Sequence, residues 1–110
     1  MKRALTALIA LGLSTTAVLA EYPEKPVEVI VGYSAGGGTD VMARTVAQFL
    51  EQELNGSVVV KNMPGAGGQI GFTEVAGANP DGYTLGTFNL PAALALTHDR
   101  EADYDVTSFT

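Results

Sequence analysis

Apolar residues follow two different spacings along the chain, and these spacings predict three strands separated by two helices. Short runs rich in β-branched or aromatic residues predict strands at 27–32, 57–61 and 83–88. Apolar residues that recur every three or four positions predict helices at 39–54 and 69–76. The residues expected to face the core are Met42, Ala43, Val46, Phe49, Leu50 and Leu54 in the first helix, and Ile70 and Val75 in the second.

The order of these elements predicts an α/β fold with a parallel sheet. A βαβαβ unit with tight connections has right-handed crossovers, and its first strand is expected in the centre. Asn55 and Gly56 are expected to end the first helix, and 79–82 to form a turn. A helical turn or two is expected after Pro91, with an irregular acidic segment at 98–110. Ligands of such folds bind beyond the carboxyl ends of the strands, where the strand order reverses.

The glycine-rich stretch 32–40 lies at this predicted position. Gly32-x-Ser34-x-Gly36 has the spacing of a hydrolase nucleophile elbow, in which Ser34 would need a histidine base. His98 is the only histidine, and it lies in the acidic segment at 98–110. A dinucleotide-binding loop would need a third glycine at a spacing that this stretch lacks. In a further alternative, the glycines only turn the chain and bind no ligand.

An anion-binding loop fits the same stretch better. Backbone N–H groups of Gly37 and Gly38 can converge on an oxygen at the start of the following helix, beside the hydroxyls of Ser34 and Thr39. The carboxylate of Asp40 would oppose an anion, so it is expected to cap the helix or to hold a water or a ligand amino group.

Two further loops are expected at the same edge of the sheet. Residues 64–68 (PGAGG) follow the second strand and open the second helix, which repeats the construction of the first loop. Asn89 follows the third strand. Three loops rich in N–H or amide donors suggest one cleft for one small polar ligand.

Charge and composition narrow the classes of partner. The 110-residue chain has a net charge of −6 and contains no cysteine. The acidic balance argues against nucleic acid and anionic membrane surfaces as partners. The absence of cysteine excludes thiolate catalysis and Cys-metal sites, and a single histidine provides no His cluster for a metal. No cofactor and no metal are expected.

Residues 1–20 are expected to form a secretory signal peptide. Lys2 and Arg3 precede an apolar core at 4–13, and Val18, Leu19 and Ala20 form a small-residue cleavage site. The core is shorter than the ~20 residues that a membrane-spanning helix needs. An exported protein without direct membrane insertion after cleavage is therefore predicted, and its net charge would be −8.

Several motifs in the same order resemble one known family. They are YPEKP at 22–26, VEVIVGYSAGGGTDVMAR at 27–44, VVVKNMPGAGGQIG at 58–71, ANPDGYTL at 78–85 and YDVTSFT at 104–110. This combination resembles the extracytoplasmic solute-binding receptors of tripartite tricarboxylate transporters, the Bug or TctC family. The common family form has Pro-Phe where this chain has Gly32 and Tyr33, which would alter the pocket wall.

The resemblance implies a type II periplasmic-binding-protein fold, in which two α/β domains close over a ligand, usually a carboxylate. Residues 21–110 would be the N-terminal part of domain 1, with the second domain absent from this chain. The implied protein is a periplasmic, non-enzymatic receptor, monomeric when full length, that delivers its ligand to membrane transporter subunits. The alternative is a secreted α/β serine hydrolase with Ser34 as nucleophile.

The resemblance also implies which residues contact the carboxylate, largely through backbone N–H groups and ordered water. The first-loop contacts would be Tyr33, Ser34, Gly37, Gly38, Thr39 and Asp40, and the second-loop contacts Ala66, Gly67 and Gly68. Asn89 is added from its position after the third strand.

Overall fold

The computed structural model describes residues 21–99 and 101–109, which form three strands and three α-helices. The predicted signal peptide at 1–20 lies outside the described residues. The α-helices and strands, in chain order, are β1 (Val27–Val31), α1 (Gly38–Leu54), β2 (Val58–Asn62), α2 (Gln69–Gly77), β3 (Thr84–Gly86) and α3 (Leu90–Asp99). Two short 3₁₀ helices, η1 (Ala66–Gly68) and η2 (Val106–Ser108), complete the elements. None of the helices in the described part of the chain has the length and apolar character needed to cross a membrane.

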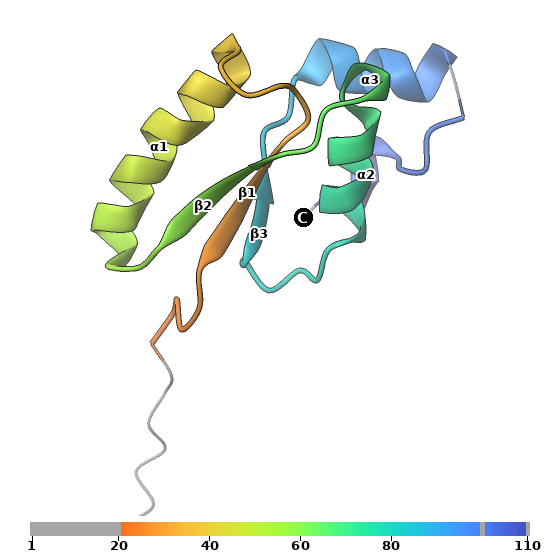
Figure 1. The fold of residues 1–110 in the computed structure, drawn as a ribbon. Coiled ribbons are helices and arrows are strands. Elements are labelled where there is room, and N and C mark those ends of the chain that lie inside the picture. Colours follow the sequence, from red (N-terminus) through yellow and green to blue (C-terminus); the bar gives the residue numbers. More distant parts are fainter. Residues whose placement is uncertain (1–20, 100, 110) are drawn as a thin grey trace, which may run out of the picture.

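The three strands form a parallel sheet in the order β2-β1-β3, which confirms the predicted α/β fold and the central place of the first strand. Val29 lies beside Val60 on one neighbour and beside Leu85 on the other. Figure 1 shows α1 on one side of the sheet and α2 on the other. Both faces of β1 are therefore covered, and Val27, Ile30 and Val31 are almost completely buried.

The buried stripe of α1 agrees only in part with the predicted one, since Ala43, Leu50 and Leu54 pack in the core as expected. Ala43 and Ala47 face the sheet, whereas Met42, Val46 and Phe49 are 55%, 51% and 63% exposed. The helix carries two apolar stripes about one position apart, and amphipathicity alone does not choose between them. Small alanine side chains allow the helix backbone to lie close to the strands, and the half-buried Leu50 and Leu54 continue that stripe.

A second core lies on the opposite side of the sheet and is centred on Phe72, which is 1% exposed. Its ring packs against Phe88 and Tyr104 at centroid distances of 5.4 and 5.9 Å. The prediction that Ile70 faces the core is wrong, since 49% of it is exposed. A nine-residue helix with glycine at both the third and the last position gives a weak periodic signal, so Phe72 was not identified from the sequence.

The ends of the helices follow the turn chemistry of the sequence. Asn55 takes a left-handed conformation (φ 50°, ψ 41°) and ends α1, as predicted. The helical turn expected after Pro91 is a ten-residue helix, α3, which begins one residue earlier. The expectation that 98–110 is irregular is wrong at both ends of that range. His98 lies in the last turn of α3, and Asp105 caps η2 through its side chain.

Candidate functional site

The loops that follow the three strands lie at one edge of the sheet, together with the first residues of α1, η1 and α3 (Figure 1). Parallel strands bring their carboxyl ends to the same edge, so this arrangement follows from the topology. The edge collects backbone N–H groups that the helices themselves cannot use.

The first loop ends in an exposed helix N-terminus. Gly37 is the N-cap of α1, in an extended conformation that any residue adopts (φ −77°, ψ 168°). The first helical hydrogen bond runs from the Val41 N–H to the Gly37 carbonyl, at 3.0 Å. The N–H groups of Gly38, Thr39 and Asp40 therefore lie ahead of the helical ladder, and they carry the positive end of the helix dipole.

Within the described residues, no steric contact requires glycine at positions 37 and 38. A Cβ added at Gly38 would meet nothing within 4 Å, and one at Gly37 would lie 3.4 Å from the Ser34 carbonyl oxygen, an ordinary contact. Neither residue has a positive φ, whereas Gly36 does (φ 85°). Glycine at 37 and 38 instead leaves open space in front of the helix N-terminus, where a ligand could approach the backbone closely.

Asp40 is the one buried polar side chain recorded in the described residues, with 2% of its surface exposed. Its Oδ2 accepts a hydrogen bond from the Gly36 N–H at 2.8 Å, and its Oδ1 accepts one from Asn62 Nδ2 at 2.9 Å. Arg44 Nε lies 3.0 and 3.1 Å from the two oxygens. The hydrogen bonds from Arg44, Gly36 and Asn62 lower the pKa of Asp40 to about 2, so the buried group is a carboxylate at neutral pH.

The expectation that Asp40 caps α1 is therefore wrong in its detail. The N-cap residue, Gly37, has no side chain that could accept a capping hydrogen bond, and Asp40 lies in the third helical position. From there its carboxylate reaches back to the loop N–H of Gly36 rather than to the free N–H groups of the first turn. It holds the loop that precedes the helix.

The second loop has more residues with a positive φ than the first. Gly65, Ala66, Gly67 and Gly68 all have a positive φ, between 48° and 141°. Ala66 and Gly67 are exposed, whereas Gly68 is buried and its N–H donates to the Gly65 carbonyl at 3.0 Å. This loop therefore offers two exposed backbone units, and Gly68 has a packing role.

Close packing joins the second loop to the first. A Cβ added at Gly32 would lie 3.0 Å from the Gly68 carbonyl oxygen, and one at Gly68 would lie 3.2 Å from the Tyr33 hydroxyl. The Tyr33 ring, half-buried, also packs edge-on against Phe72. Tyr33 and Gly68, one predicted contact residue from each of the first two loops, thus lie close together. Among the described residues no hydrogen bond ties Asn89 to them, and its carbonyl accepts the Ala93 N–H of α3.

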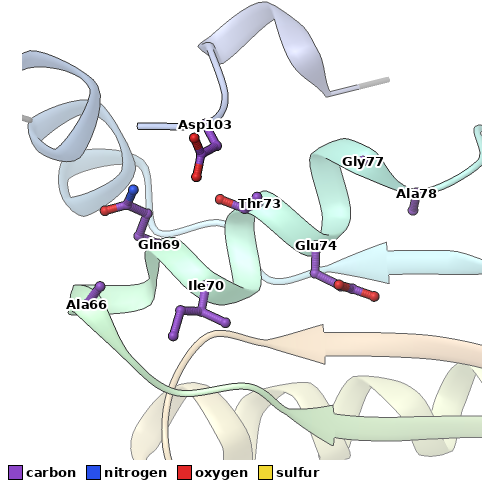
Figure 2. Close-up of a pocket in the computed structure, with 8 residues that line it drawn as sticks. All are labelled: Ala66, Gln69, Ile70, Thr73, Glu74, Gly77, Ala78 and Asp103. Carbon is purple, nitrogen blue, oxygen red and sulfur yellow. The ribbon is translucent and has the colours of Figure 1, made fainter. Parts of the chain in front are cut away.

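The hollow drawn in Figure 2 is a different feature. This open cavity of about 500 Å³ lies along α2, and of the predicted ligand-binding residues only Ala66 lines it. In Figure 2 the Asp103 side chain points toward Thr73 of α2, while Glu74 points to the other side of the helix. The predicted anion-binding loop at 32–40 is largely exposed, and none of its residues lines this hollow.

The nucleophile-elbow alternative finds no catalytic geometry in the described residues. Ser34 is exposed, and no hydrogen bond joins it to His98 in that part of the chain. His98 instead lies with its Nδ1 3.0 Å from the neighbouring Asp99 Oδ1, on a side chain that is 88% exposed. A triad needs the base within hydrogen-bond reach of the nucleophile and an acid behind it.

Sequence reasoning missed two residues that organise this edge, Arg44 and Asn62. The signals were present, because Asp40 and Arg44 have the i, i+4 spacing of a helical ion pair. Asn62 is the last residue of β2, at the same sheet edge as the first loop. Without the register of β2 against β1, no sequence feature connects Asn62 to Asp40 across 22 positions.

A parallel α/β unit with glycine-rich loops at the carboxyl edge is typical of domains that bind small ligands there. The family model described as "Tripartite tricarboxylate transporter family receptor" (TctC) matches residues 42–107. The chain belongs to this family, which confirms the resemblance seen in the sequence. It is a family of receptors, so the serine hydrolase alternative is wrong.

Comparison with individual proteins gives the same family. Protein BugT of Bordetella pertussis (strain Tohama I) is 41% identical over 97 residues, which are 84% of this chain and 30% of BugT. The periplasmic binding protein BugD is 52% identical, with a TM-score of 0.56 over 57% of this chain and 21% of BugD. MatC from Rhodopseudomonas palustris, solved with bound malate, is 34% identical, with a TM-score of 0.70 over 76% of this chain and 29% of MatC. The chain thus spans less than a third of the length of these proteins.

Proposed function

We propose that this chain is the N-terminal part of the first domain of an exported, periplasmic receptor that captures a small carboxylate and delivers it to a membrane transporter. The family match supports the receptor role. BugD is described as periplasmic, and MatC was solved with malate, a dicarboxylate. The signal-peptide pattern at 1–20 supports export.

The observation that carries the proposal is the exposed N-terminus of α1 behind Gly37 and Gly38. These glycines leave free space in front of three N–H groups that the helix does not use. A carboxylate oxygen fits such a group of donors, since the N–H dipoles and the helix dipole both favour negative charge. Local donors are needed because the chain as a whole carries −6.

Within this proposal the predicted contacts take different roles. Gly38 and Thr39 donate backbone N–H groups, and Ser34 and Thr39 add hydroxyl donors from the same loop. Ala66 and Gly67 present exposed backbone from the second loop. Tyr33 and Gly68 form the packed floor between the loops, Gly37 leaves room for the ligand, and Asp40 holds the loop. Asn89 would approach from the third loop.

The proposal is tested with malate as the probe, in a chimera in which residues 21–109 replace the matching segment of MatC. Gly38→Val fills the open space and is expected to weaken malate binding at least about tenfold, as measured by calorimetric titration. The unliganded melting temperature should change little, because the added side chain meets nothing within 4 Å.

Gly77→Ala is the matched control, since Gly77 also has nothing within 4 Å but lies at the far end of α2. This variant should bind malate like the parent chimera. A Gly38→Val chimera with unchanged affinity would overturn the assignment of the ligand to this loop.

A further inference from the structure

We propose that Arg44 and Asn62 are positioning residues that fix the glycine loop through the buried carboxylate of Asp40, and that Arg44 also neutralises this carboxylate beside the bound anion. The part of this inference that concerns ligand affinity rests on the proposed function. The part that concerns the loop stands on the hydrogen bonds alone.

The hydrogen bonds join three separate segments at one point. Asn62 Nδ2, from the end of β2, donates both to Asp40 Oδ1 at 2.9 Å and to the Tyr33 carbonyl at 3.0 Å. Asp40, from α1, accepts the Gly36 N–H at 2.8 Å. Tyr33, which precedes the turn closed by the Gly37 N–H and the Ser34 carbonyl, and Gly36, which lies inside that turn, are therefore both held. That turn immediately precedes the free N–H groups of α1, so its geometry sets where those groups point.

Arg44 completes the same network from the outside. Its Nε donates to both oxygens of Asp40, and its Nη2 donates to Asn62 Oδ1 at 2.9 Å. Asn62 thus has its oxygen and its nitrogen engaged, and this fixes the orientation of the amide. No buried side-chain nitrogen or oxygen atom in the described residues lacks a hydrogen-bond partner. Removal of either Arg44 or Asn62 would leave the buried carboxylate undersatisfied.

The charge of Asp40 gives Arg44 a second role. A carboxylate in the first turn of α1 repels an anion bound at the same N-terminus, and its burial reduces screening by water. The Arg44 guanidinium lies 3.0 Å from Asp40 Oδ2 and cancels that charge. Lysine at position 44 would keep the charge but could not supply the forked contacts to both Asp40 and Asn62.

The loop part of the inference is tested without any ligand, by amide hydrogen exchange of Gly36 in the 110-residue chain. Asn62→Leu and Arg44→Gln are expected to speed exchange of the Gly36 amide at least about tenfold, because they loosen its acceptor. Gln52→Ala, an exposed position on the same helix, is the control and should leave it unchanged. Arg44 is half-exposed, so its variants should fold, and far-ultraviolet circular dichroism checks this. Unchanged Gly36 exchange in folded Arg44→Gln and Asn62→Leu would overturn the positioning role.

The charge part is tested by a double-variant cycle for malate binding in the MatC chimera. Arg44→Gln is expected to lose about tenfold or more in affinity, and Arg44→Lys to lose less. Adding Asp40→Asn to Arg44→Gln should restore much of the loss, because the uncompensated charge is gone. A purely structural role predicts a double variant as weak as the single one, and that result would refute charge compensation. A parent chimera that fails to bind malate would refute the proposed function instead, and the exchange experiment would still decide the loop part.

Discussion

The contact between α2 and the end of β1 can be tested by adding one methyl group at Gly71. A Cβ at this position would lie 2.7 Å from Gly32 Cα, 3.1 Å from Gly32 N and 3.4 Å from the Met63 carbonyl oxygen. Carbon atoms in contact normally lie about 3.5–4.0 Å apart, so the overlap with Gly32 is close to 1 Å. The atoms overlapped are backbone atoms, which cannot rotate away as a side chain would. Gly71→Ala must therefore move α2 or the first loop.

The expected loss can be estimated from two opposing effects. Overpacking of a well-packed site costs about 1–3 kcal/mol. Alanine in a helix gains up to about 1 kcal/mol over glycine, which offsets part of this cost. A net loss of about 1–2 kcal/mol in the free energy of unfolding is expected, which corresponds to a fall in Tm of roughly 5–15 °C for a domain of this size.

Gly77→Ala is the matched variant in the same helix. A Cβ at Gly77 meets nothing within 4 Å, so only the gain in helix propensity remains. This variant should be more stable than the parent by a few tenths of a kcal/mol to about 1 kcal/mol. Urea unfolding of the 110-residue chain, followed by far-ultraviolet circular dichroism, gives both values. A Gly71→Ala chain as stable as Gly77→Ala would show that α2 does not approach β1 this closely.

Three further predictions follow from the two cores and from Asp40. Phe72→Ala should cost about 3–5 kcal/mol in urea unfolding, because Phe72 is buried among aromatic rings, and a loss below about 1 kcal/mol would contradict that packing. Ala47→Leu should destabilise the fold by about 1–3 kcal/mol, whereas Phe49→Gln should change its stability by about 0.5 kcal/mol or less. The reverse order would mean that Phe49, as predicted from the sequence, and not Ala47 is buried. Folding lowers the pKa of Asp40 from 3.8 to about 2, so its contribution to stability is present above pH 3.8 and is lost as the pH falls toward 2. The pH dependence of urea unfolding should therefore be flatter across this interval in Asp40→Asn, and equal slopes in the two proteins would refute it.

The sequence predicted most of the elements and their order correctly. The β-branched run at 27–31 forms a strand in any context that buries both of its faces, and Asn55 with Gly56 ends a helix by local backbone preference. The place of the glycine loops followed from topology, since the carboxyl ends of parallel strands share one edge. These features depend on residues close together in the chain.

The sequence could not choose which apolar stripe of α1 is buried. Met42, Val46 and Phe49 are larger and more hydrophobic than Ala43 and Ala47, so the pattern alone favours the stripe that is exposed. The choice depends on how closely the helix lies to the sheet. That distance is a property of the assembled layers, and small side chains win where backbones approach.

The sequence by itself determined the order of the strands, the end of α1, the family and the edge at which the donors gather. Only the tertiary structure assigned Asp40 its role, because its partners come from the preceding loop, from the next turn of α1 and from the end of β2. From the sequence alone, one can say only that a buried carboxylate needs hydrogen-bond donors. Which donors it finds depends on the register of β2 against β1, since that register brings Asn62 to the loop.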